Sequence, residues 1–130
     1  MAAVLLVEDD ADTREVVSML LEEEGYAVVG ASDGQEAVAY LASCEALPCL
    51  VLLDLQMPRV GGIAVLRWMS SHPKTAGVPV AVISARPEAK GSELATKFRN
   101  HVTEVLQKPF DLDRVLKLLE SHCGSEQPAA

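Results

Sequence analysis

The sequence predicts an α/β protein in which a doubly wound parallel sheet lies between two layers of helices. Short apolar runs alternate with stretches of helical spacing, and this alternation repeats five times along the 130 residues. The apolar runs are continuous, which is typical of strands covered on both faces. Strands that alternate with helices through right-handed crossovers form a parallel sheet with helices on both sides. We therefore expect a (βα)5 three-layer sandwich with a five-stranded parallel sheet.

The predicted strands are short runs rich in Val, Leu and Ile. Continuous apolar runs of this length favour buried strands. They are Ala3–Val7, Tyr26–Val29, Cys49–Leu53, Val80–Ile83 and Thr103–Leu106.

Helix boundaries are indicated by capping residues. The first helix, Asp12–Glu24, stops at Gly25, and the second opens in a capping box at Asp33. The remaining predictions are a helix over Gly62–Ser71, a weak helix over Pro87–Arg99, and a last helix capped by Asp111. The apolar stripes are Val16, Met19 and Leu20, then Ala37, Val38 and Leu41, then Val65, Leu66 and Met69, then Leu94, Ala95 and Phe98, and finally Leu112, Val115, Leu116 and Leu119.

Composition limits the classes of function. With 49% hydrophobic and 23% charged residues, the chain is that of a folded globular domain large enough for its own core. A net charge of −8 disfavours nucleic acid as a direct partner, because binding to phosphates relies on Lys and Arg. Without an apolar run of the length that spans a bilayer, the chain is not expected to enter a membrane or to carry a secretory signal.

The three cysteines, Cys44, Cys49 and Cys123, show no C-x-x-C spacing. His122 is adjacent to Cys123, but the histidines and cysteines do not follow zinc-site intervals. We expect reduced thiols in a cytoplasmic protein, and neither a zinc site nor a disulfide framework.

Polar residues follow the predicted strands, where parallel sheets bind ligands. They are Glu8, Asp9 and Asp10 after the first strand, Asp54 at the end of the third, Ser84 after the fourth and Lys108 after the fifth. Converging carboxylates repel one another, so the arrangement favours a hard divalent cation such as Mg²⁺ among them. Ser84 and Lys108 then suit the oxygens of a phosphoryl group, and Asp54 is the natural nucleophile.

These residues lie in the motifs V-L-L-V-E-D-D, D-G-Q-E-A, L-L-D-L-Q-M-P-R-V-G-G, V-I-S-A and K-P-F. Taken together, the motifs resemble the receiver domain of bacterial response regulators. The resemblance covers about residues 3–121 and implies a flavodoxin-like strand order, 2-1-3-4-5. We expect a receiver domain over residues 1–121 and a flexible tail over residues 122–130.

The resemblance also implies a role for each site residue. Asp54 would be the phospho-acceptor, Glu8 and Asp9 would hold Mg²⁺, and Gln56 would add its backbone carbonyl to the metal. Ser84 and Lys108 take the positions of the family's hydroxyl residue and lysine. Gly61 and Gly62 fit the glycine-bearing turn after the phosphorylation loop.

Three positions concern regulation. Val105 occupies the place where family members usually carry an aromatic ring that reorients on activation, so a route through an aromatic rotamer is not expected. Gln56 and Arg86 occupy positions that line the approach to the phosphoryl group and tune its hydrolysis. An ordinary solvated pair is an equally good interpretation of these two residues.

The favoured function is a signalling switch that takes a phosphoryl group from a histidine kinase or phosphotransfer protein and changes a protein-binding surface. Output would then pass to a downstream protein or a fused output domain. Beyond its own phosphorylation and dephosphorylation, no enzymatic reaction is expected. The alternative is a pseudo-receiver that binds partners without phosphorylation. A dehalogenase-type phosphatase is disfavoured because Gln56 replaces its second Asp, and a flavin carrier because E-D-D-A-D-T would repel phosphate.

Overall fold

The structure is a computed structural model that describes residues 3–55, 57, 61–85, 98, 101–108 and 111–124. The strands are β1 (Val4–Val7), β2 (Val28–Ala31), β3 (Leu50–Asp54), β4 (Val80–Ser84) and β5 (Val102–Gln107). The helices are α1 (Ala11–Glu23), α2 (Gly34–Ser43), α3 (Gly62–Ser71) and α5 (Leu112–Cys123), with a 3-10 turn at Pro73–Thr75. The weak helix expected over Pro87–Arg99 lies outside the described residues except for Phe98.

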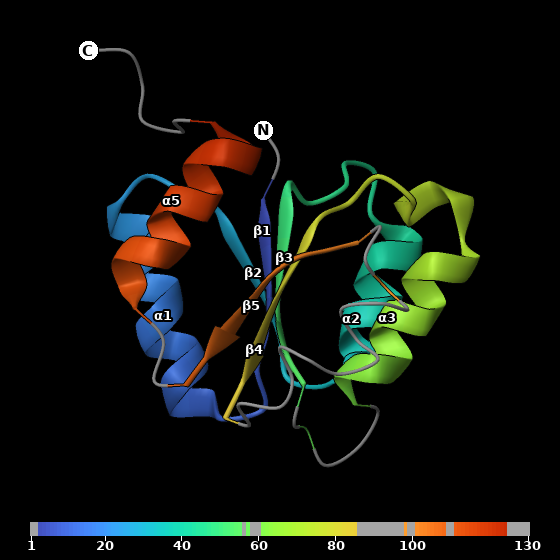
Figure 1. Ribbon diagram of the computed structural model, residues 1–130, viewed down its shortest axis with the longest axis horizontal. Coiled ribbons are helices and arrows are strands. Elements are labelled where there is room, and N and C mark those ends of the chain that lie inside the picture. Colours follow the sequence, from blue (N-terminus) through green and yellow to red (C-terminus); the bar gives the residue numbers. More distant parts are fainter. Residues whose placement is uncertain are drawn as a thin grey trace.

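The five strands form one parallel sheet in the order β2-β1-β3-β4-β5, as expected. Figure 1 shows α1 and α5 on one face of the sheet and α2 and α3 on the other. β1 and β3 pair from Val4–Leu50 to Val7–Leu53, so both strands end at the same edge. A register shift after Val80 separates the start of β5 from an otherwise regular ladder.

Each strand supplies both layers of the core, which explains why the apolar runs are continuous. In β1, Leu5 and Val7 pack in the cluster with residues of α2 and α3, whereas Val4 and Leu6 pack in the cluster with residues of α1 and α5. Successive side chains of a strand point to opposite faces, so a strand buried on both sides needs apolar residues throughout.

Side-chain caps fix where the helices begin. Asp33 accepts a hydrogen bond from the backbone N–H of Glu36 at 2.8 Å, and Asp111 accepts one from Asp113 at 3.0 Å. Gly25, with a φ of 95°, follows the end of α1 in the left-handed region that glycine adopts without strain. The predicted caps of α2 and α5 and the predicted stop after α1 are therefore confirmed.

The predicted inward stripe of α1 is wrong. Val16 and Met19 are 55% and 54% exposed, and the helix instead buries Val17 and Leu21 against the sheet. Apolar residues occupy both faces of this helix, so their spacing supports two stripes. The packing of α1 on the sheet selects the second one.

The expectation of reduced thiols is also wrong for two of the three cysteines. Cys49 and Cys123 form a disulfide, with Cα atoms 5.2 Å apart, and Cys44 is free. The two bonded residues are 74 positions apart, so no local spacing could indicate the pair. They meet because β3 begins, and α5 ends, at the same edge of the sheet. α5 continues through Cys123, two residues beyond the domain end expected from the sequence.

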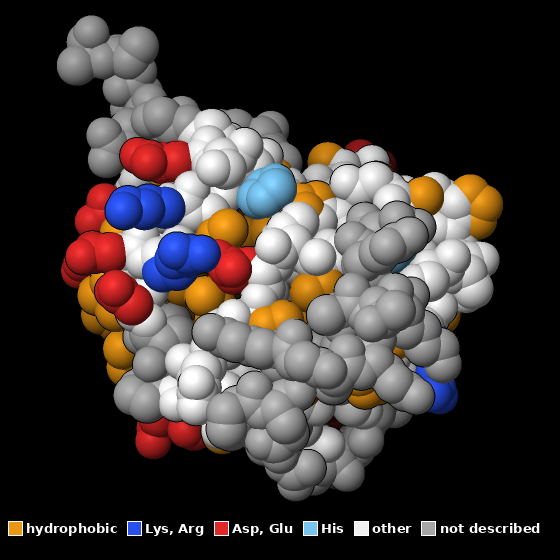
Figure 2. Space-filling model, viewed as in Figure 1, with side chains coloured by type: hydrophobic (Ala, Val, Ile, Leu, Met, Phe, Trp, Pro, Cys, Tyr) orange, Lys and Arg blue, Asp and Glu red, His pale blue; other side chains and the backbone are white. Residues whose placement is uncertain are grey.

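In the view of Figure 2, charged side chains gather mainly over α1 and α5. Arg114 of α5 forms an ion pair with Glu104 of β5. Among the described residues, no helix is long and apolar enough to cross a membrane.

Candidate functional site

The predicted site residues meet at one edge of the sheet. Glu8 and Asp9 directly follow β1, Asp54 and Ser84 end β3 and β4, and Lys108 directly follows β5. Because the strands are parallel, their carboxyl ends lie side by side, and residues far apart in the sequence converge there.

Lys108 links two of the carboxylates. Its Nζ donates to Oδ2 of Asp54 across 3.0 Å and to Oε1 of Glu8 across 3.3 Å. The backbone N–H of Lys108 also donates to the carbonyl oxygen of Ser84 at 2.8 Å. The ammonium group is therefore held over Asp54 by both its side chain and the pairing of β5 with β4.

Among the residues that the structure describes, the cluster carries more negative than positive charge. Carboxylate oxygens of Glu8, Asp9 and Asp54 all lie within 4.8 Å of one another, and Lys108 pairs with two of these residues. Asp54 is only 1% exposed and Glu8 only 4%, whereas Asp9 faces solvent. One ammonium group cannot neutralise three carboxylates, so the oxygen-only donor set fits a hard divalent cation such as Mg²⁺.

The protonation of the site reflects this crowding. Burial raises the pKa of Glu8, and the nearby charge of Asp54 raises it further against the opposing effect of Lys108. Burial alone would lower the pKa of Lys108, but its hydrogen bond to Asp54 and the charges of Asp54 and Glu8 outweigh that effect and raise the pKa. Lys108 is thus a stable cation beside the carboxylate of Asp54.

Arg14 of α1 is a structural contributor that the sequence did not single out. Its Nη1 donates to the backbone carbonyl of Glu8 at 2.7 Å, and the N–H of Asp10 donates to Oε2 of Glu8 at 3.1 Å. The only sequence signal is Gly30 on β2, where a Cβ would lie 3.2 Å from Cδ of Arg14. A glycine opposite a long side chain is too common to predict this contact.

Gly62 determines how closely α3 approaches the end of β3. A Cβ at this position would lie 2.8 Å from Cα of Leu55 and 2.9 Å from the carbonyl oxygen of Asp54. A Cβ at Gly61 would instead meet its nearest heavy atoms at 3.9 Å. Of the two glycines predicted to form the turn, Gly62 is the one that close packing requires.

Sequence comparison bears directly on this arrangement. Residues 4–120 match the family described as "Response regulator receiver domain". The chain belongs to the response regulator receiver family. Its sheet order and its convergent acidic cluster are those expected from the resemblance seen in the sequence.

Known relatives of this receiver include regulators and single receiver domains. It is 38% identical over 116 residues to a transcriptional regulatory protein CpxR homolog of Haemophilus influenzae, covering 89% of this chain and 47% of that protein. A response regulator receiver protein from Pseudomonas putida has a TM-score of 0.81 at 28% identity, with 92% and 96% of the two chains covered. Response regulator protein TrrA of Thermotoga maritima, solved with Mg²⁺–BeF, has a TM-score of 0.78 at 25% identity, with 93% and 98% covered.

The receiver spans about half the length of several curated regulators that it matches.

Two of its predicted regulatory residues, Gln56 and Arg86, lie outside the described residues. Val105 is half-buried, pairs with Val82 of β4 and packs against the core on the α2 and α3 side. A short β-branched side chain in that environment has no second rotamer comparable to the swing of an aromatic ring.

Proposed function

We propose that this receiver is a phospho-accepting signalling switch in which Asp54 receives a phosphoryl group from a histidine kinase or phosphotransfer protein. The observation that carries the proposal is the buried carboxylate of Asp54 held 3.0 Å from the ammonium group of Lys108, beside two further acidic side chains. A structural aspartate at the end of a strand needs no such surroundings.

The transfer forms one bond and breaks one bond. An oxygen of Asp54 attacks the phosphorus of phosphohistidine, the P–N bond breaks, and the imidazole leaves with the electron pair of that bond. Negative charge stays on the phosphoryl oxygens during this exchange. The ammonium group of Lys108 lies where it can stabilise that charge, and its raised pKa keeps it protonated.

Ser84 is placed to contact the transferred group from the neighbouring strand. It ends β4, is only 2% exposed, and its carbonyl oxygen accepts the backbone N–H of Lys108. Glu8, Asp9 and Asp54 would hold Mg²⁺, which would supply charge neutralisation at the phosphoryl oxygens. The backbone carbonyl of Gln56 remains the proposed further ligand.

Partners follow from the same chemistry. The phosphodonor would be a protein phosphohistidine, and the output would be a downstream protein or an output domain fused to the receiver. We propose that the chain catalyses only its own phosphorylation and dephosphorylation, and that it acts in the cytoplasm. Support for the signalling role comes from the named relatives, one of which is a transcriptional regulatory protein homolog and another a response regulator protein solved with Mg²⁺–BeF.

The test is phosphorylation by a small-molecule phosphodonor in the presence of Mg²⁺, followed by intact-mass measurement. Wild type should gain one phosphoryl group, about 80 Da. Asp54→Asn, or removal of Mg²⁺ with a chelator, should abolish the gain. Asp33→Asn is the matched control, because asparagine also caps a helix and Asp33 lies at the start of α2.

Labelling that survives Asp54→Asn at the wild-type rate would contradict the assignment of the acceptor. Absence of labelling in folded wild type, with both a small phosphodonor and a phosphorylated histidine phosphotransfer protein, would favour the pseudo-receiver alternative.

A further inference from the structure

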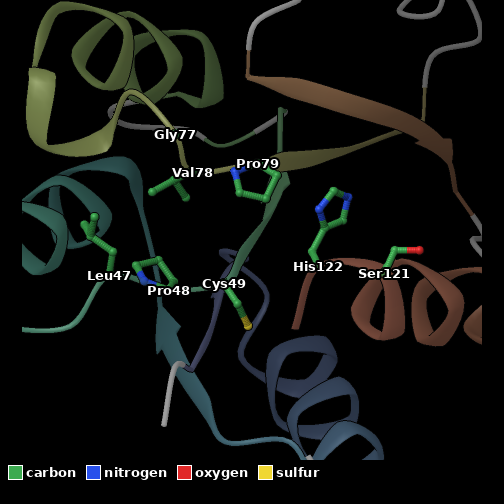
Figure 3. A pocket seen from close by; sticks show the side chains of 8 residues that line it. All are labelled: Leu47, Pro48, Cys49, Gly77, Val78, Pro79, Ser121 and His122. Atoms are coloured by element: carbon green, nitrogen blue, oxygen red, sulfur yellow. The ribbon is translucent and has the colours of Figure 1, made fainter. Parts of the chain in front are cut away.

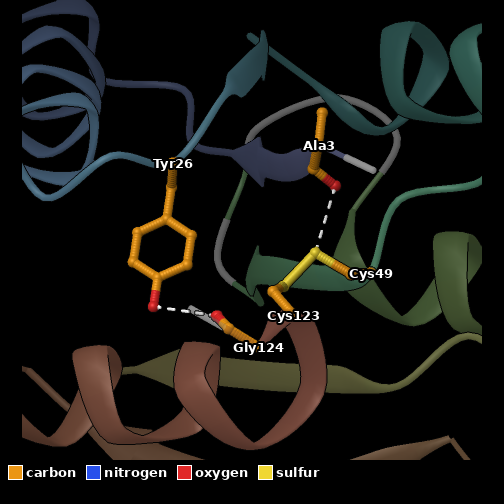
Figure 4. The surroundings of a disulfide bond; sticks show 5 residues. All are labelled: Ala3, Tyr26, Cys49, Cys123 and Gly124. Carbon is orange, nitrogen blue, oxygen red and sulfur yellow. Dashed lines mark hydrogen bonds between the residues drawn. A yellow bond between two sulfur atoms is a disulfide. The ribbon is translucent and has the colours of Figure 1, made fainter. Parts of the chain in front are cut away.

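A covalent cross-link lies at the opposite edge of the sheet from the acidic cluster. Cys49 directly precedes β3, the strand that ends in Asp54, and Cys123 is the last residue of α5. Figure 4 shows the bond between these two elements, beside Ala3 and Gly124. The disulfide thus joins the base of the acceptor strand to the end of a helix that covers the sheet.

One of the two cysteines lines a groove that lies beside the bond. Neither cysteine is fully buried, and a groove of about 600 Å³ opens beside the bond. Its walls come from the segments before β3 and β4 and from the end of α5, including Pro48, Cys49, Gly77, Val78, Ser121 and His122 (Figure 3). Cys49 lines the groove, whereas Cys123 is not among its lining residues.

The buried residues of the two core clusters do not include the bonded cysteines, which only pack against one of them. Both core layers are filled by apolar side chains of all five strands and the described helices, and α5 buries Val115 and Leu119 independently of Cys123. The sulfur of Cys49 lies 3.7 Å from the carbonyl oxygen of Ala3, which is a ready acceptor for a thiol S–H (Figure 4). A domain of this size can fold without covalent staples, so the reduced protein should stay native.

The bond does hold the last turn of α5. Glu120, Ser121 and His122 are exposed, and Cys123 is the residue of that turn that is partly buried. Beyond it, the hydroxyl of Tyr26 donates to the carbonyl oxygen of Gly124 at 3.3 Å. With so few tertiary contacts, the last turn should fray once the sulfurs separate.

We propose that the Cys49–Cys123 disulfide is a reversible redox site, opened by a dithiol reductant that enters through this groove, and that its opening releases the last turn of α5. A thiolate of the dithiol attacks the sulfur of Cys49, the S–S bond breaks, and Cys123 leaves as a thiolate that takes up a proton. The second thiol of the dithiol then attacks the reagent's other sulfur, which is the one bonded to Cys49 in the mixed disulfide. This step frees Cys49 as a thiol. The dithiol is oxidised to a cyclic disulfide, and the protein gains two electrons and two protons.

The experiment measures reduction of the folded protein. Cys44→Ser removes the free thiol, so oxidised and reduced forms differ by two alkylated cysteines in an intact-mass spectrum after maleimide treatment. The folded variant is incubated with graded concentrations of dithiothreitol. Two alkylations should appear without loss of the far-UV circular dichroism signal, and oxidised glutathione should reverse them. Amide hydrogen exchange should quicken on reduction at residues 120–124 and not in β1 or β3.

The groove is tested separately at Gly77. Gly77 lines the groove, and a Cβ there would meet no heavy atom within 4 Å, so the position accepts a side chain at its first atom. Gly77→Trp adds bulk at this wall of the groove, and Gly77→Ala is the matched control. Gly77→Trp should slow reduction of the disulfide by roughly threefold or more, because access to the attacked sulfur sets the rate. The equilibrium ratio of reduced to oxidised protein should not change. Gly77→Ala should behave like wild type.

Three results would overturn the proposal. Reduction that requires denaturant would make the bond an inert cross-link. Reduced Cys49 and Cys123 that oxidised glutathione cannot rejoin in the folded protein would show that the bond is not reversible. Equal reduction rates for Gly77→Trp and Gly77→Ala would exclude the groove as the route.

Discussion

At the scale of single residues, Gly62 shows how the packing of α3 against the end of β3 depends on the absence of one methyl group. A Cβ at this position would overlap backbone atoms of Asp54 and Leu55, which cannot move aside as a flexible side chain can. Gly62→Ala should therefore lower the free energy of unfolding by on the order of 1–3 kcal/mol. Gly61→Ala, which meets nothing closer than 3.9 Å, should change it by less than about 1 kcal/mol. Urea unfolding of the two variants measures the difference, and equal losses would contradict the close approach.

Glu8 gives a prediction on pH in the metal-free protein. Its pKa in the folded state is raised above 4.5, so the folded state binds more protons than the unfolded state just above pH 4.5. The contribution of Glu8 to stability is therefore greatest at low pH and falls as pH rises from 4.5 through the folded-state pKa. Glu8→Gln should remove that part of the decline. Unfolding curves from pH 4 to pH 8 with a chelator test this, and parallel pH profiles for the two proteins would contradict it.

At the scale of secondary-structure elements, α1 tests which apolar stripe faces the sheet. Leu21 is fully buried, so Leu21→Ala should cost about 2–5 kcal/mol of unfolding free energy. Met19 lies on the opposite stripe and is 54% exposed, so Met19→Ala should lower the free energy of unfolding by no more than about 0.5 kcal/mol. The two substitutions remove side chains of similar size from one helix, so chemical denaturation compares them directly. A larger loss of unfolding free energy for Met19→Ala than for Leu21→Ala would show that the stripe predicted from the sequence faces the sheet.

The same elements show what the sequence can and cannot specify. Strand positions and the fold class are predictable because a strand buried on both faces requires a continuous apolar run, as in β1 and β3. The face of α1 that packs on the sheet cannot be predicted, because apolar residues at positions 16, 17, 19, 20 and 21 fit two different helical stripes. The cross-link between Cys49 and Cys123 is not predictable either, because only the completed sheet and α5 bring the two residues together.

The candidate site was predictable in outline because parallel strands bring their ends together. Asp54, Ser84 and Lys108 needed only the correct strand ends to be placed at one edge. The support of Glu8 by Arg14 was not foreseen, because a side chain that reaches a backbone carbonyl leaves no motif. Gly62 was foreseen as part of a turn, but its packing against Asp54 required the structure.

At the scale of the whole molecule, folding assembles like charges, and Mg²⁺ should relieve their repulsion. At ten times its dissociation constant, Mg²⁺ should stabilise wild type by roughly 1.4 kcal/mol. For a domain of this size, the melting temperature should rise by roughly 3–6 °C. Mg²⁺ should raise the melting temperature of Asp9→Asn much less, whereas it should raise that of Asp33→Asn as much as that of wild type. Equal shifts for Asp9→Asn and wild type would show that Asp9 does not take part in the site.

The central claim is that Asp54, and no other carboxylate of the acidic cluster, forms an acyl phosphate. Borohydride reduces an acyl phosphate to an alcohol but leaves a free carboxylate unchanged, so treatment of the phosphorylated protein marks the acceptor. Peptide mass spectrometry should find homoserine at position 54 and unmodified Glu8, Asp9 and Asp10 in the same sample. A reduced side chain at any of those three positions, or an intact Asp54 in phosphorylated protein, would contradict the account.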